Sequence, residues 1–151
     1  MTVEQHFAAY QAYHQNPRNK TTHYLGIPLI VYAILNLLFQ VPLPGWPYFN
    51  LALVLFVVVS VFYLSLNVRL ALGMGLLTLP LYVLAIWTPW WVGLAAFVVG
   101  WILQLIGHQV EGKKPAFLTN FVHLFIGPLW IASHLMEKLG LWRPRQVEIA
   151  R

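Results

Sequence analysis

The chain has 151 residues, of which 60% are hydrophobic and only 9% are charged, whereas an ordinary soluble domain has roughly 45–50% apolar and about 25% charged residues. Because too few polar side chains remain to cover a folded surface in water, we expect a single integral membrane domain over 1–151 and exclude a soluble enzyme. The formal net charge is +5 and Cys is absent, which excludes disulfides, thiolate zinc sites and iron–sulfur clusters.

The first 23 residues predict an amphipathic helix followed by a sharp corner. One helical stripe carries the residues at i, i+4, i+7 and i+11, namely Val3, Phe7, Tyr10 and His14. Asn16 then suits a helix N-cap and Pro17 suits the first helical position. A second helix is therefore expected to begin at Pro17 and to run through His23 into the membrane. We expect no cleavable signal peptide, because this segment has no apolar core.

The middle of the chain, residues 24–107, predicts an all-α bundle of about four membrane spans. Arg69 is the only charged residue between Tyr24 and Gly107, and turn residues divide the apolar block. The expected spans are Tyr24–Gln40, Tyr48–Leu66, Leu70–Trp87 and Trp90–Gly107. Each is close to the ~20 residues that cross a hydrocarbon core of ~30 Å.

Basic residues predict the orientation of the bundle. They precede the first span and follow the second and fourth, whereas the loops 41–47 and 88–89 carry no charge. By the positive-inside rule, both termini and every basic loop lie on the cytoplasmic face. The membrane would be the inner membrane of a bacterium, or the endoplasmic reticulum of a eukaryote.

Residues 108–151 hold a second apolar segment and a basic tail. Phe117–Leu135 is apolar enough to span, but it contains His123, His134 and the helix-breaking pair Gly127–Pro128. If it crossed the membrane, the arginines of the tail (Arg143, Arg145 and Arg151) would lie outside, against the charge rule. We therefore expect an interfacial or re-entrant helix.

Histidine is confined to the flanks of the apolar block. The six residues are His6, His14, His23, His108, His123 and His134. On one continuous helix His14 and His23 would point in opposite directions, but the corner at Asn16–Pro17 can aim both into one space. His108 ends the fourth span, and Glu111 follows three residues later on the same helix face. Three imidazoles and a carboxylate on one membrane face would suit Fe(II) or Zn(II).

Each of these side chains also fits a plain structural role. His14 could be the polar edge of a helix, His23 a headgroup-level side chain, and His108 with Glu111 a helix-end pair. His123 and His134 fit structural positions, and His6 fits a solvated one. The protein would then be a non-enzymatic membrane component, either a transporter or a scaffold.

Several other functions stay open at this point. A transporter needs polar residues along its spans, and these hold little beyond Asn36, Ser60, Ser65, Thr78 and Gln104. A bis-histidine haem protein needs His pairs on facing spans. A zinc-dependent membrane hydrolase would differ in its metal and in its indifference to O2.

Two segments carry a family resemblance. Tyr13–His23 (YHQNPRNKTTH), followed by Gly26–Pro28, resembles the first signature of the 2-hydroxy-palmitic-acid dioxygenase family. Gln104–Ala116 (QLIGHQVEGKKPA) is similar to the second signature. The resemblance implies an Fe(II)-dependent dioxygenase of fatty-acid α-oxidation, which shortens a 2-hydroxy fatty acid by one carbon with O2.

The resemblance also implies site residues. His14, His23 and His108 match the iron-ligand histidines, and Glu111 matches an acid that is either a fourth ligand or a group that orients a ligand. The family usually continues to an acid where this chain has His134, which leaves the role of His134 open. Asn19, His123 and His134 are additional candidates for the site.

Further polar residues flank the expected metal site. The basic side chains that would attract the substrate carboxylate are Arg18, Lys20, Lys113 and Lys114. Each of them alone also fits a topology signal or a contact with anionic lipid. Asn19 fits either a hydrogen bond near the metal or a turn cap. The expected partners are a 2-hydroxy fatty acid, O2 and membrane lipid, with no nucleic acid; the oligomeric state is open.

Overall fold

The computed structural model describes residues 1–145 and confirms an all-α fold. Its elements are α1 (Val3–Gln11), α2 (Pro17–Phe39), β1 (Pro42–Leu43), β2 (Trp46–Asn50), α3 (Leu51–Leu66), α4 (Val68–Trp87), α5 (Trp90–Glu111), the 3-10 turn η1 (Ala116–Leu118) and α6 (His123–Lys138). Arg151, which belongs to the predicted basic tail, lies outside the described residues.

The corner between α1 and α2 forms where the sequence predicts it. Asn16 caps α2 by accepting a hydrogen bond from the backbone N–H of Arg18 at 2.9 Å, and Pro17 is the first helical residue. The helix α2 then continues without a break through His23 to Phe39. The preceding helix α1 ends earlier than the apolar stripe suggests, so His14 lies in the turn after it.

Within residues 1–145, three helices are long and apolar enough to cross a membrane, namely α2, α4 and α5. The helix α3 has 16 residues and a length of only ~24 Å at 1.5 Å per residue. The second span begins later than Tyr48 because residues Trp46–Asn50 form a strand that pairs with β1. Asn50 ends this hairpin and caps α3, accepting a hydrogen bond from the N–H of Leu53 at 3.0 Å.

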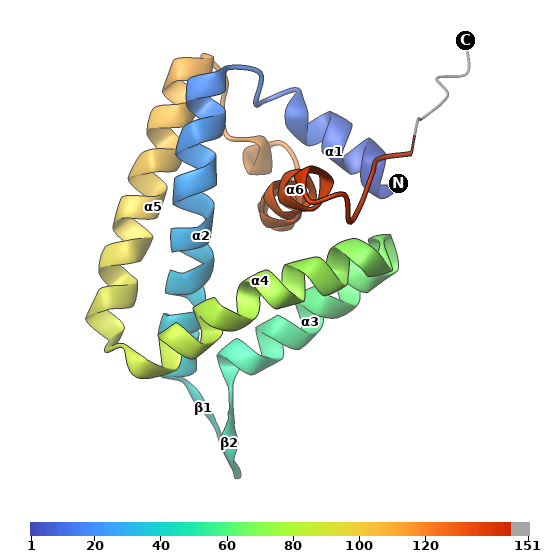
Figure 1. Ribbon diagram of the computed structural model, residues 1–151. Coiled ribbons are helices and arrows are strands. Elements are labelled where there is room, and N and C mark those ends of the chain that lie inside the picture. Colours follow the sequence, from blue (N-terminus) through green and yellow to red (C-terminus); the bar gives the residue numbers. More distant parts are fainter. Residues whose placement is uncertain (146–151) are drawn as a thin grey trace.

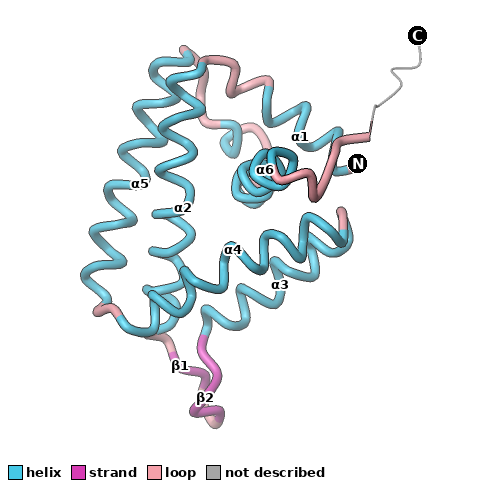
Figure 2. Tube along the Cα trace, viewed as in Figure 1, coloured by secondary structure: helices cyan, strands magenta, loops and turns pink. Residues whose placement is uncertain are grey.

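The helices pack as two pairs with α6 beside them (Figure 1). The helices α2 and α5 run antiparallel along each other, and α3 and α4 form a second pair that meets them at one end. Figure 2 shows the same arrangement, with the short hairpin projecting at that end. Glycine permits the closest approach: a Cβ at Gly26 would lie 2.9 Å from the carbonyl oxygen of Gly100. Small residues at such a contact are typical of membrane helix pairs.

The segment predicted as interfacial or re-entrant forms η1 and α6. Within the described chain α6 is not among the helices long and apolar enough to span a membrane. It packs against α1, α2 and α4. Leu129 and Trp130 of α6 are buried with Tyr10 of α1 and Leu70 of α4 in one apolar cluster. This packing closes the space between the two helix pairs near the corner.

Candidate metal centre

His14 and His23 are held by the same kind of contact. The Nδ1 of His14 donates a hydrogen bond to the carbonyl oxygen of Tyr10 at 2.7 Å, and the Nδ1 of His23 donates to that of Asn19 at 2.9 Å. A carbonyl oxygen can only accept, so Nδ1 carries the proton in both neutral rings and Nε2 carries a lone pair. This arrangement of the second ring nitrogen is typical of metal-binding histidines.

The two Nε2 atoms face each other at 3.0 Å. With both Nδ1 atoms protonated, neither Nε2 has a proton to donate, so two lone pairs oppose each other at hydrogen-bond distance. A cation between or beside them removes this repulsion. The local geometry therefore fits a metal ion better than it fits a purely structural pair of imidazoles.

His108 completes the cluster from α5. Its ring centroid lies 5.2 Å from that of His14 and 4.9 Å from that of His23. One ligand atom from each of the three histidines lies within 4.8 Å of the other two. The antiparallel packing of α2 on α5 explains this meeting, since His23 is near the start of one helix and His108 near the end of the other.

The cluster is shielded from water. The exposed fractions of His14, His23 and His108 are 0%, 1% and 6%. The Nδ1 of His108 has no hydrogen-bond partner in the described part of the chain. Burial lowers the pKa of His14 to about 4, because desolvation disfavours the charged imidazolium. At neutral pH this ring is therefore in the uncharged form that binds metal ions.

Glu111 holds the corner in place. Its carboxylate accepts hydrogen bonds from the backbone N–H of Gln15 at 2.9 Å and of Asn16 at 2.8 Å, and from the Asn19 amide at 3.0 Å. The Asn19 amide also donates to the carbonyl oxygen of Tyr13 at 3.1 Å. The Glu111 carboxylate at the end of α5 thus binds the loop that carries His14 and is not part of the three-histidine cluster.

The basic residues lie on the outer side of the corner. Lys113 donates to the carbonyl oxygen of Ala12 at 2.6 Å, which ties the end of α5 to the end of α1. Arg18 and Lys114 are exposed, and Lys20 is half-buried. The structure does not bring them into the buried cluster.

The remaining histidines lie outside the three-histidine cluster, but His123 lines a cavity that it shares with His14, His23 and His108, and its buried Nε2 atom has no hydrogen-bond partner among residues 1–145. The Nδ1 of His123 donates to the carbonyl oxygen of Ala116 at 3.1 Å, and its ring packs against the edge of Tyr10. His134 packs on Trp130 and bonds the hydroxyl of Tyr24 at 3.1 Å. The expectation of a solvated His6 is wrong, because this residue is buried when α1 packs on the rest of the protein.

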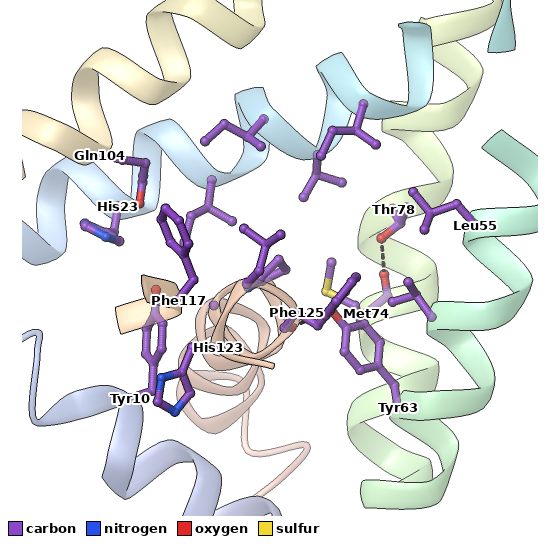
Figure 3. Close-up of a pocket in the computed structure, with 18 of the residues that line it drawn as sticks. Tyr10, His23, Leu55, Tyr63, Met74, Thr78, Gln104, Phe117, His123 and Phe125 are labelled. Atoms are coloured by element: carbon purple, nitrogen blue, oxygen red, sulfur yellow. Dashed lines mark hydrogen bonds between the residues drawn. The ribbon is translucent and has the colours of Figure 1, made fainter. Parts of the chain in front are cut away.

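An apolar cavity of about 160 Å³ extends from the three histidines between α2, α3, α4 and α6 (Figure 3). His23, Gln104 and Tyr10 lie at one end, whereas Leu55 and Thr78 lie at the other. Sequence reasoning did not assign Gln104 or Tyr10 to the site. A signal for Gln104 was present, since it is a polar residue in a predicted span one turn before His108.

Comparison with known proteins gives the family. The family profile described as "2-hydroxy-palmitic acid dioxygenase Mpo1-like" matches residues 1–139. The chain belongs to the Mpo1-like family. A curated Mpo1-like relative, the 2-hydroxy-palmitic acid dioxygenase MPO1 of Saccharomyces cerevisiae, is 33% identical over 137 residues, which cover 87% of this chain and 78% of the relative. No solved structure matches the chain.

The Mpo1-like match confirms the resemblance read from the sequence. Both signature segments, Tyr13–His23 and Gln104–Ala116, lie inside the matched region. The fold brings these two segments together around His14, His23 and His108.

Proposed function

We propose that this protein is an Fe(II)-dependent dioxygenase of fatty-acid α-oxidation. It converts a 2-hydroxy fatty acid to the fatty acid that is one carbon shorter, consuming O2 and releasing the carboxyl carbon. The observation that carries the proposal is the pair of opposed Nε2 atoms of His14 and His23 beside His108, at the end of an apolar cavity. The yeast relative is named for a dioxygenase of this substrate class.

The residues present fit the metal. His14, His23 and His108 would hold Fe(II), a metal for which imidazole is a suitable ligand. Bound iron would supply the redox chemistry with O2 that the side chains of this protein lack. The neutral state of the buried His14 keeps its lone pair available, and the carbonyl oxygens of Tyr10 and Asn19 fix the ring orientations.

The rest of the site would bind and orient the substrate. The apolar cavity would take the acyl tail, and burial of the histidines would keep water from the reacting end. Glu111 would act as a positioning residue by holding the loop that carries His14. Arg18, Lys20, Lys113 and Lys114 would attract the carboxylate towards the cytoplasmic face, where we also place both termini.

A zinc-dependent hydrolase is the second candidate. Three histidines are a ligand set that catalytic zinc sites use, and the cluster would suit this ion as well. The family relationship favours the dioxygenase, because the name of the yeast relative specifies an oxygen-consuming reaction.

The deciding experiment measures metal and oxygen in the same sample. The protein is purified anaerobically in detergent, its metal content is determined, and O2 uptake is recorded after addition of 2-hydroxypalmitate. We expect about one iron per chain and O2 uptake that requires the 2-hydroxy acid. Zinc without O2 uptake would favour the hydrolase, and absence of any metal would give the histidines a structural role.

A further inference from the structure

The polar side chains that line the cavity differ between its two ends. At the far end, the hydroxyl of Tyr63 donates to the carbonyl oxygen of Phe125 at 2.6 Å and that of Thr78 donates to the carbonyl oxygen of Met74 at 2.8 Å. Their hydrogen-bonding capacity is thus used within the protein. At the histidine end, the Nε2 atom of Gln104 is buried without a hydrogen-bond partner among residues 1–145, as are the Nε2 atom of His123 and the Nε1 atom of Trp101. Tyr10 also lines this end, with its hydroxyl on the side of Phe117 (Figure 3).

Gln104 is nine-tenths buried, with an exposed fraction of 7%, and its Nε2 atom is without a partner among the described residues. It precedes His108 by one helical turn and so lies on the same face of α5. Room for its carboxamide comes from Gly26, where an added Cβ would lie 2.6 Å from the Nε2 atom. Since no hydrogen bond fixes the carboxamide, it can present either its N–H groups or its oxygen to the cavity.

Tyr10 is also buried, with an exposed fraction of 4%. Its ring stacks on that of His14 with 4.1 Å between the centroids, and its carbonyl oxygen holds the same histidine. Figure 3 shows the ring between His123 and Phe117, with the hydroxyl on the side of Phe117. The phenol hydroxyl of Tyr10 can both donate and accept a hydrogen bond.

A buried polar group without a partner is costly, and this applies to the Nε2 atom of Gln104. Gln104 and Tyr10 both line the cavity beside the histidines, where the polar head of the substrate would lie. A carboxylate only accepts hydrogen bonds, which matches the two N–H bonds of a carboxamide. A 2-hydroxyl both donates and accepts, which matches a phenol. The basic residues that would attract the carboxylate from outside do not bind it in the cavity, because Arg18, Lys20, Lys113 and Lys114 are not among the described residues that line it.

We propose that Gln104 donates to the carboxylate of the 2-hydroxy fatty acid and that Tyr10 hydrogen-bonds to its 2-hydroxyl. This inference rests on the proposed function and adds the groups that recognise the substrate head. The acyl tail then runs away from the histidines along one face of α2, past Ile27, Ile30 and Ile34, towards Leu55 and Thr78. The two residues determine specificity and position the substrate; the histidines hold the metal.

The test is a binding experiment that needs no turnover. Iron-loaded protein in detergent is kept anaerobic, and affinities are measured by competition for three ligands: 2-hydroxypalmitate, palmitate without the hydroxyl, and hexadecane-1,2-diol without the carboxylate. We expect Gln104→Leu to weaken binding of 2-hydroxypalmitate at least about tenfold, as for loss of a hydrogen bond to a charged group. Its affinity for the diol should not change.

The second variant is Tyr10→Phe. Its ratio of affinities for 2-hydroxypalmitate and palmitate should be about fivefold lower than that of the wild type, as expected for the loss of one neutral hydrogen bond. Gln104→Glu keeps a polar side chain but repels a carboxylate, so it should also bind 2-hydroxypalmitate weakly and the diol normally. Tyr63→Phe and Thr78→Val are matched controls, because they remove hydroxyls from the other end of the same cavity. Both controls should keep the wild-type order of the three ligands.

The outcomes separate the two proposals. If wild-type protein binds 2-hydroxypalmitate no better than palmitate or the diol, the proposed function fails and this inference fails with it. If the wild type discriminates and the Gln104 and Tyr10 variants do so equally well, the inference alone is overturned. If these variants retain iron but their affinities for all three ligands fall equally, the two side chains have a packing role, and this inference is also overturned.

Discussion

At the scale of single residues, the site depends on which ring nitrogen carries the proton. Backbone carbonyl oxygens bind the Nδ1 atoms of His14 and His23, and this contact directs both Nε2 lone pairs at each other. The two lone pairs repel each other when no cation is present, and a bound cation would accept both. We therefore expect the three histidines to differ sharply from the other histidines in their effect on metal binding.

Replacement of His14, His23 or His108 by Ala should lower iron affinity more than about 100-fold. Loss of a group that only supports a ligand typically lowers metal affinity about 10–100-fold. Activity should disappear with the metal, while the chain still inserts into the membrane. His23 and His108 lie in helices, which Ala favours, and His14 lies between helices. Metal analysis after gel filtration checks this. His134→Ala is the matched control, since His134 contacts Trp130 and Tyr24 instead. Full iron content in two of the three variants would contradict the assignment.

Replacement of Glu111 by Ala should weaken iron binding about 10–100-fold without abolishing it. The physical reason is loss of three hydrogen bonds that fix the corner carrying His14. Excess iron should restore activity in this variant but not in the histidine variants, and titration with Fe(II) measures the difference. Glu137→Ala, at an exposed position, is the control. If saturating iron fails to restore the Glu111 variant, the carboxylate is itself a ligand.

At the scale of helices, the contact between α2 and α5 sets the distance between His23 and His108. Gly26 and Gly100 lie in this contact, and side chains larger than hydrogen would meet the opposite backbone. The geometry of the proposed metal centre therefore depends partly on glycines that lie outside the three-histidine cluster.

Replacement of Gly100 by Val should destabilise the protein by about 1–3 kcal/mol, as overpacking usually does, and should weaken iron binding as the two helices separate. An added Cβ at this position would lie 2.7 Å from Ile30. Gly75→Ala is the control, since its Cβ meets nothing within 4 Å and Ala is the better helix former. Thermal unfolding in detergent, with and without iron, measures both effects. Unchanged stability of Gly100→Val would show that the contact is loose.

The sequence predicts features that depend on neighbouring residues, such as helix caps, and misses features that depend on contacts between residues far apart in the chain. Asn16 and Pro17 identify the corner because capping is a property of neighbouring residues. By contrast, Glu111 bonds the backbone of Gln15 across 96 positions, and no local pattern encodes that partner. The same holds for the buried His6 and for Gln104, whose surroundings come from other helices. Family signatures supplied the histidines that spacing alone leaves ambiguous.

At the scale of the whole molecule, most of the helices line the cavity that we propose for the acyl tail. Its polar end is built by the corner and α5, and its apolar end by α3 and α4. The length of the acyl chain that fits is thus a property of how the two helix pairs meet (Figure 1).

Replacement of Gly75 by Leu should shift the preference towards shorter 2-hydroxy fatty acids. Gly75 lines the cavity and has open space at its Cβ position, so the new side chain shortens the cavity without displacing the backbone. Competition between 2-hydroxy acids of twelve and sixteen carbons measures the shift. We expect the ratio of their affinities to change about tenfold, because the longer chain can bury fewer methylenes in the shortened cavity. Leu76→Phe, at an exposed neighbouring position, is the control and should leave the preference unchanged. An identical shift in both variants would contradict a cavity that limits chain length.

The order of the ligands along the chain has a consequence for synthesis. His14 and His23 leave the ribosome early, whereas His108 follows only after the rest of the membrane helices have been made. An unfinished chain therefore offers two of the three imidazoles, and the third arrives when α5 inserts beside α2. If iron binds to these three histidines, its site is complete only after α5 has been made, and a chain truncated before His108 would lack one of the proposed ligands.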